Sequence, residues 1–165
     1  MASRLRGPLR LFRIADRRHP LFDGMGSFAH GNRWSSRGRR VIYTAETYAG
    51  ALLEMLAHCN IGSIPRTHAW IEISAPEKIS VERVEAASIS GWNGDNLTPM
   101  RTFGDQWHAE KRSAILLVPS VVTAGIESNA LVNQDHPDFR LMQASDPREV
   151  LWDRRLFERA ADSRA

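Results

Sequence analysis

The chain has 165 residues, 42% of them hydrophobic and 25% charged, which is typical of one globular domain and excludes both a disordered chain and two ordinary domains. Its single cysteine, Cys59, excludes an internal disulfide and a zinc site of paired thiolates, and the lack of a long apolar segment excludes a membrane helix and a secretory signal, so we expect a soluble cytoplasmic protein. The net charge of +3 is unevenly distributed, because residues 1–40 hold ten arginines against two aspartates.

The N-terminal quarter of the chain is predicted to hold two strands joined by a long loop. Leucines alternate with other residues over 8–14, a period typical of a strand. Residues 15–40 are rich in Gly, Ser, Arg and His and lack such a period. A loop of that length inside a compact domain is usually functional. Residues 41–45, with the sequence VIYTA, form a second short strand.

A helix and a hairpin are predicted next. Residues 46–59 keep the spacing of an amphipathic helix, with Thr44 as its cap and Cys59 on its apolar, core-facing stripe. Residues 68–74 and 78–84 each alternate with period two and are separated by a turn that contains a proline. This pattern predicts that the two segments pair as a β-hairpin.

The C-terminal part is predicted to contain a second helix and several short strands. A helix over 98–112 begins at Thr98-Pro99, with proline at its first position. Residues 114–118, AILLV, are typical of a buried strand. Further short strands are expected at 121–128, 129–133, 139–143 and 150–153. The whole predicts a single mixed α+β domain over 1–165, with a basic arm over about 1–7 and an undefined tail after about 158.

The basic block over residues 1–40 points to an anionic partner. Its net charge is +8, whereas residues 41–165 carry −5. Arginine binds phosphate with two parallel hydrogen bonds, so the candidates are nucleic acid, a phosphorylated small molecule or an acidic protein. Aromatic residues lie within the block, which motivates one hypothesis, a basic nucleic-acid-binding or RNA-acting toxin. No recognised nucleic-acid motif accompanies them.

Three residues whose side chains could bind a ligand or take part in catalysis follow one another at intervals of ten and eleven residues. Arg33 precedes Trp34 in the loop sequence GNRW, Tyr43 lies on the second strand, and Glu54 lies on the first helix. Each has a structural alternative: a surface guanidinium stacked on Trp34, a half-buried strand aromatic, and a solvated glutamate on the outer face. For Glu54 alone, helix geometry favours the solvated alternative.

Two more polar residues follow the buried strand over 114–118. Ser120 comes where that strand ends, in the sequence LVPSVV, and either lines a cleft or bonds its own turn. Asn129 begins NALVNQDH and either supplies an amide donor or shapes a loop. The six histidines show no ligand spacing, so we expect no metal site.

Together these segments resemble the RES domain, a family named for an arginine, a glutamate and a serine. The matching residues here are Arg33, Glu54 and Ser120. The resemblance runs through LFRI, GNRW, VIYTAETYAGALLEML, AILLVPSVV and NALVNQDHPDF. The family often has GGRWN and NPxH where this chain has GNRWS and NQDH, and neither difference touches the named residues or Tyr43.

The resemblance implies a fold similar to mono-ADP-ribosyltransferases and a function as the NAD-consuming toxin of a type II toxin–antitoxin pair. Such toxins degrade NAD with phosphate or water, or transfer its ADP-ribose to a protein. NAD is then a substrate, and no metal is needed. The resemblance also implies a helix-turn-helix antitoxin that covers the active site, with no membrane contact and with nucleic acid bound only through the antitoxin.

The chemistry of NAD cleavage suggests a role for each residue. Glu54 stabilises the cation that develops on the ribose, as in glycoside hydrolysis. The predicted catalytic residues are Arg33, Tyr43, Glu54 and Ser120. The predicted NAD-binding residues are Arg13 and Arg33 for the pyrophosphate, Tyr43 for the nicotinamide ring, and Trp34, Ser120 and Asn129. Ser120 either hydrogen-bonds the substrate or orients Glu54.

Overall fold

A strongly curved sheet of nine strands forms the frame of the protein in a computed structural model, which describes residues 3–4, 7–58 and 64–157. The order along the sheet is β1-β5-β6-β7-β3-β2-β4-β8, and β9 pairs with β4. Only β5 and β6 run parallel among the described strands. The strands are β1 Ser3–Arg4, β2 Leu9–Asp16, β3 Val41–Ala45, β4 His68–Ala75, β5 Ser80–Arg83, β6 Ile115–Pro119, β7 Ser128–Asn133, β8 Gln143–Ala144 and β9 Arg148–Glu149.

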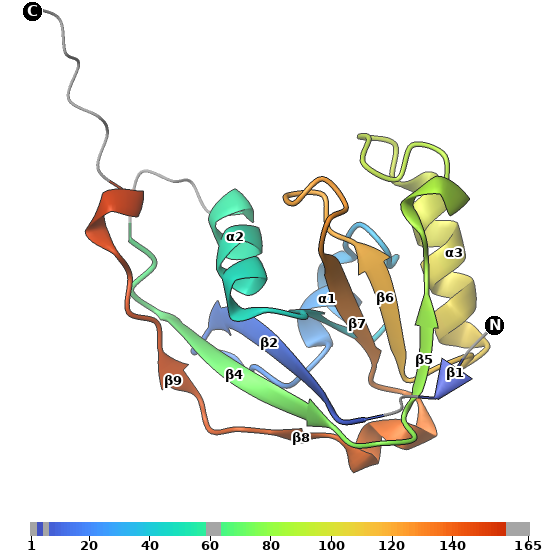
Figure 1. The fold of residues 1–165 in the computed structure, drawn as a ribbon, viewed down its shortest axis with the longest axis horizontal. Helices are drawn as coiled ribbons and strands as arrows, with labels where there is room; N and C mark the ends of the chain where they lie inside the picture. The colour runs from blue at the N-terminus through green and yellow to red at the C-terminus, as the bar shows by residue number, and fades with distance from the viewer. Residues whose placement is uncertain (1–2, 5–6, 59–63, 158–165) are drawn as a thin grey trace, which may run out of the picture.

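Three α-helices and three short 3-10 helices accompany the described sheet. In Figure 1, α2 stands over β2 and β4, whereas α3 lies beyond β5 and β6 at the other end of the sheet. The α-helices are α1 Met25–His30, α2 Tyr48–His58 and α3 Thr98–Ala109. The 3-10 helices are η1 Ala86–Ser88, η2 Pro137–Leu141 and η3 Arg154–Leu156.

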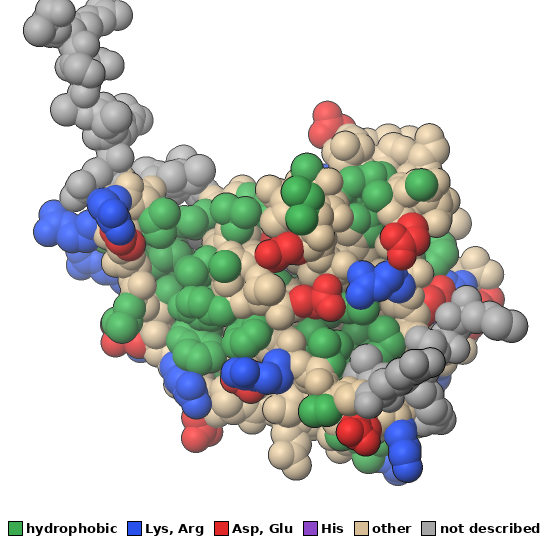
Figure 2. Space-filling model, viewed as in Figure 1, with side chains coloured by type: hydrophobic (Ala, Val, Ile, Leu, Met, Phe, Trp, Pro, Cys, Tyr) green, Lys and Arg blue, Asp and Glu red, His purple; other side chains and the backbone are tan. Residues whose placement is uncertain are grey.

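Alternation along the strands divides the core into three clusters. On β6, Ile115 and Leu117 face a cluster enclosed by the curved sheet, whereas Leu116 and Val118 face α3. Both faces of this strand are buried, which explains its continuous apolar sequence. A third cluster lies beneath α2, and Figure 2 shows hydrophobic side chains gathered on this face, over α2, β2 and β9.

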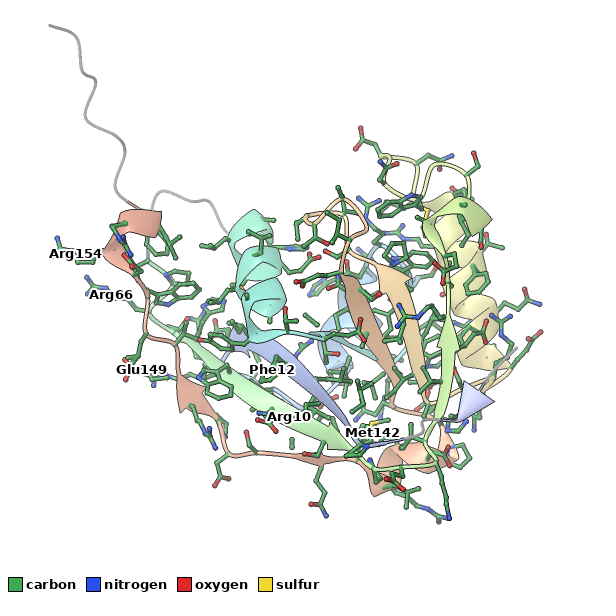
Figure 3. All side chains as sticks on the ribbon, in the orientation of Figure 1. Arg10, Phe12, Arg66, Met142, Glu149 and Arg154 are labelled. Carbon is green, nitrogen blue, oxygen red and sulfur yellow. The ribbon has the colours of Figure 1, made fainter. Side chains whose placement is uncertain are left out.

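The strand β2 links two of these clusters. Leu11 faces the enclosed cluster, and Phe12 packs under α2 with Tyr48. Arg10 and Phe12 lie on the same side of β2 (Figure 3), and the guanidinium carbon of Arg10 is 5.6 Å from the centre of the phenyl ring. Arg10 also forms a two-bond ion pair with Glu72 on β4, with both distances 2.7 Å.

Most of the predicted elements are confirmed. The strands over 8–14, 41–45, 114–118 and 129–133 appear as β2, β3, β6 and β7, with ends shifted by no more than two residues. The two predicted helices are α2 and α3, each shorter than expected. Cys59, placed on the apolar stripe of the first helix, lies outside the described residues.

The predicted hairpin of 68–74 with 78–84 is wrong. The strand β4 pairs with β2 along its full length, whereas β5 crosses to the far end of the sheet and pairs with β1 and β6. Alternation identifies a strand but not its partner, and here Val81 on β5 lies beside Ile115 on β6 in the enclosed core. Lys78, with φ of 73°, helps the chain turn away between the two strands.

One predicted loop and several predicted short strands also differ in the structure. Residues 15–40 contain the helix α1. Of the segment 121–128, residues 121–127 form a tight turn and only Ser128 belongs to a strand, because Ala124 and Gly125 adopt φ of 53° and 80°. The segment expected as a strand at 139–143 is mostly the 3-10 helix η2, and Val150 begins no strand although its side chain is buried.

Partial burial of three histidines predicts that the protein loses stability in mild acid. Desolvation lowers the pKa of His68, His108 and His136, and the nearby Asp135 only partly offsets this for His108. In mild acid these histidines therefore bind protons more readily in the unfolded chain than in the folded chain. Their contribution to the free energy of unfolding is present above the unfolded pKa of about 6.5 and is lost as the pH falls below it.

We therefore expect urea unfolding to give a lower free energy of unfolding at pH 5.5 than at pH 7.5. Each pKa unit between the folded and unfolded states corresponds to about 1.4 kcal/mol. His108→Gln removes the most buried of the three rings and should flatten the dependence. Equal stability at both pH values would contradict the interpretation.

No helix in the described part of the chain is long and apolar enough to cross a membrane.

Candidate functional site

A cleft of about 530 Å³ opens where the sheet splits between β2 and β3. The two strands pair only at Phe12 and Ala45, so their remaining lengths diverge. The walls of the cleft come from β2, β3, α2, the GNRW segment and the chain around the ends of β6 and β7. Side chains that are far apart in sequence therefore meet around one cavity.

The helix α2 begins next to this cleft and is capped by Thr47. The Thr47 hydroxyl accepts a hydrogen bond of 2.9 Å from the Gly50 N–H and donates one of 3.0 Å to the Glu127 carboxylate. The predicted cap, Thr44, is wrong: it lies on β3, and its hydroxyl donates to the Ala130 carbonyl. The Thr47–Glu127 contact ties the start of α2 to the turn between β6 and β7.

The carboxylate of Glu54 lines the cleft rather than facing bulk solvent. Its Oε1 accepts hydrogen bonds from the Ser120 hydroxyl at 2.8 Å and from the Asn129 amide at 2.6 Å. Both bonds end on Oε1, and no described group donates a hydrogen bond to the other carboxylate oxygen, Oε2. The arrangement fixes the side chain and leaves one carboxylate oxygen for a ligand.

Ser120 and Asn129 lie at the two sides of the turn between β6 and β7. Ser120 is 2% exposed and does not line the cleft, so it acts on a ligand only through Glu54. Asn129 lines the cleft and also holds Glu54. The structure thus brings Glu54, Ser120 and Asn129 together and makes the serine a positioning residue.

The Tyr43 ring also lines the cleft, but its hydroxyl is occupied. That oxygen accepts from the Trp34 N–H at 3.2 Å and shares a hydrogen bond of 2.9 Å with the Ser35 hydroxyl. Burial raises the pKa of Tyr43 above its ordinary value, so the phenol stays neutral. Tyr43 is suited to offer an apolar ring face rather than to exchange a proton.

Arg33 lines the cleft but is already engaged with the protein. Its Nη1 donates to the carbonyls of Trp92 at 3.2 Å and of Gly94 at 2.8 Å. These carbonyls belong to the segment between η1 and α3, which sequence reasoning did not connect with the site. The predicted stack of Arg33 on Trp34 is replaced by an edge contact between Trp34 and Phe103.

Arg13 is a partly buried cation at the wall of the cleft. Its Nη1 donates to the Tyr43 carbonyl at 2.8 Å, across the split between β2 and β3, and its buried Nε has no hydrogen-bond partner among the described residues. Desolvation lowers the pKa of Arg13 to about 10, partly offset by the charge of Asp23. No described carboxylate lies within ion-pair distance of the guanidinium.

The arginines of the basic block over residues 1–40 do not form a single anion-binding surface. Arg13 and Arg33 line the cleft, whereas Arg10, Arg18 and Arg39 form ion pairs with Glu72, Asp16 and Asp105. Much of the positive charge is thus used within the protein. Among the described residues, no group of three or more His, Cys, Asp or Glu side chains is arranged to hold a metal ion.

Comparisons with known proteins give a family match and several named relatives. Residues 10–153 match the RES domain. The chain is similar to the Prs ADP-ribosylating toxin of Sphingobium sp. (strain YBL2), with 34% identity over 83% of this chain and 87% of the relative. It is also similar to the protein named Toxin Res of Pseudomonas putida (strain KT2440), with 32% identity over 69% of this chain and 78% of that protein.

A solved structure has the same fold. A chain in the crystal structure of the M. tuberculosis MbcT-MbcA toxin-antitoxin complex superposes with a TM-score of 0.69 and 16% identity, covering 89% of this chain and 86% of that chain. The mixed α+β class expected from the sequence is confirmed. Because the family match spans most of its length, the chain belongs to the RES domain family.

Proposed function

We propose that this chain is the toxin of a toxin–antitoxin pair, which breaks the nicotinamide–ribose bond of NAD and transfers the ADP-ribose to an acceptor. Membership of the RES family supports this, as do the names of the relatives, one an ADP-ribosylating toxin. The structural neighbour comes from a toxin–antitoxin complex, which supports an antitoxin partner. We further propose that the antitoxin is a helix-turn-helix protein and covers the cleft.

The observation that carries the proposal is the fixed carboxylate of Glu54 in a cleft of dinucleotide size. When the nicotinamide–ribose bond breaks, its electron pair moves to the pyridinium nitrogen, and positive charge develops on the ribose carbon. A carboxylate oxygen beside the ribose stabilises that charge and accepts hydrogen bonds from the ribose hydroxyls. Ser120 and Asn129 hold the carboxylate in place, so little reorganisation is needed during the reaction.

The remaining cleft residues suit the other parts of NAD. The ring face of Tyr43, next to Trp34, offers a flat apolar surface for the nicotinamide. Arg13 offers a partly buried cation whose Nε–H has no partner among the described residues, and which suits the pyrophosphate. Arg33 has one nitrogen engaged with carbonyls, so its guanidinium both shapes the cleft and presents charge to it.

The role of Arg13 is tested by Arg13→Gln. Hydrogen bonds to charged groups contribute about 1.5–3 kcal/mol, so the Kd for ADP-ribose and the KM for NAD should rise about 10- to 100-fold. Calorimetry and steady-state kinetics measure the two constants. Arg10→Gln is the matched control, because Arg10 lies on the same strand but is exposed and pairs with Glu72. Equal effects of the two substitutions would exclude a specific role for Arg13.

The function itself is tested with the purified full-length chain and NAD labelled in the adenosine part. We expect free nicotinamide in every reaction, with the label in ADP-ribose, in an ADP-ribosyl phosphate when phosphate is added, or on a protein when cell extract is added. Substrate NAD that remains intact under all three conditions would overturn the proposal.

A further inference from the structure

The cleft face of α2 carries a second polar side chain besides Glu54. Ala51, Glu54, Met55 and His58 all line the cleft, and their spacing places them along one face of the helix. His58 lies one turn beyond Glu54, which is about 6 Å further along the helix axis. The imidazole therefore occupies the same wall as the carboxylate, at the more exposed end.

A hydrogen bond determines which nitrogen of His58 carries the proton. The Nδ1 atom lies 2.8 Å from the backbone carbonyl oxygen of Glu54. Since a carbonyl oxygen only accepts hydrogen bonds, Nδ1 must be the donor. In the neutral ring Nε2 then carries no hydrogen and has a free lone pair. The contact also fixes the ring against the helix.

The charged groups that line the cleft together with His58 come from two elements, β2 and α2, and from Arg33 in the GNRW segment. On β2, Arg13 and Asp16 line the cleft, and the ion pair with Arg18 holds the pKa of Asp16 well below its usual range. On α2 the neighbouring acid is Glu54, and on β3 Tyr43 stays neutral. Among the described residues no carboxylate lies within ion-pair distance of the His58 ring, so Nε2 is not committed to a partner.

The geometry points to His58 as the general base that accepts the proton of the incoming acceptor. This inference rests on the proposed function, and it applies to acceptors that must lose a proton from an O–H bond, namely water or an alcohol. The acceptor oxygen forms a bond to the ribose carbon as the bond to nicotinamide breaks. The electron pair of that bond leaves with nicotinamide, and the hydroxyl proton passes to Nε2. The proton is later released to solvent, so the reaction is balanced.

The position of His58 suits this role. Glu54 and His58 lie one helical turn apart on the same wall of the cleft, so a ribose held at Glu54 lies beside the imidazole, and an acceptor hydroxyl can contact both. His58 is exposed, so an acceptor can reach the ring from solvent.

The test compares acceptors that need a base with one that does not. His58→Gln retains a side-chain N–H for the Glu54 carbonyl but cannot take up a proton. We measure nicotinamide release and product formation by the full-length chain with water, with methanol and with sodium azide. Azide is an anion and reacts without losing a proton. His30→Gln is the matched control, because His30 is also exposed in the last turn of a helix but does not line the cleft.

We expect His58→Gln to slow hydrolysis and methanolysis by about 100- to 10,000-fold, the usual contribution of a general base. The wild-type rate should fall on acidification, whereas the residual rate of the variant should not. Azide should restore turnover of the variant, with ADP-ribosyl azide as the product.

Three results would overturn the inference. They are an unchanged rate of hydrolysis in His58→Gln, an acid dependence that persists in the variant, and equal losses with water and azide, which would indicate a structural role. A wild-type chain that releases no nicotinamide would overturn the proposed function as well, whereas the first three leave that function standing.

Discussion

Replacing Glu54 with glutamine should lower the rate of nicotinamide release by about 100- to 1,000-fold, the usual loss when a charge-stabilising group is removed. Glutamine keeps an oxygen that can accept from Ser120 and Asn129, so the fold and the cleft should remain intact. What it removes is the negative charge beside the ribose. Steady-state kinetics with NAD and a thermal unfolding curve for each protein measure the two effects, and Tm should change little. Toxicity in cells should disappear together with turnover.

Two further variants sharpen this test. Glu149→Gln removes an exposed carboxylate on β9, away from the cleft, and should leave the rate unchanged. Ser120→Ala should have a smaller effect than Glu54→Gln, because Asn129 still holds the carboxylate. A Glu54→Gln protein that remains fully active would refute the assignment of the site.

A second large effect is expected from Gly104→Ala in α3. A Cβ atom at this position would lie 1.9 Å from the backbone oxygen of Trp34, much closer than van der Waals contact. Alanine normally favours a helix over glycine by about 1 kcal/mol. Overpacking costs about 1–3 kcal/mol or more and should outweigh that gain. We expect a net loss in the free energy of unfolding, measured by urea denaturation.

The same substitution should weaken NAD binding. The helix α3 and the GNRW segment are in backbone contact at Gly104, and that segment carries Arg33 and Trp34 into the cleft. Gly26→Ala in α1 is the matched control, because its Cβ would meet nothing within 4 Å. A Gly104→Ala protein as stable as the control would show that the two elements separate easily.

Elements with a strong hydrophobic period were predictable from the sequence. Hydrophobic periodicity reflects which faces of an element are buried. One or two faces are buried in each of β2, β3, β6 and α2. Strand pairing was not predictable. The separation of β4 from β5 depends on which strands close the enclosed core, and this is decided by residues far away in the chain.

The candidate site was predictable as a set of residues but not as a geometry. Helix geometry alone favoured an outward Glu54, because the cleft arises from the divergence of β2 and β3, which no local pattern reports. Ser120 was expected either to hydrogen-bond the substrate or to orient Glu54, and only the structure shows that it holds Glu54 from a buried position. The carbonyls bound by Arg33 lie about sixty residues away along the chain and carry no side-chain signature.

The turn between β6 and β7 joins the two donors that hold Oε1 of Glu54. The Ser120 N–H bonds the Glu127 carbonyl, and the Gly125 N–H bonds the Ser120 carbonyl, so the turn closes on itself. Surface connections of this kind usually accept insertions during evolution. Here one added residue would shift Ser120 relative to Asn129, and the Glu54 carboxylate would lose a hydrogen-bond donor. The length of this turn therefore determines whether the Glu54 carboxylate keeps both of its donors.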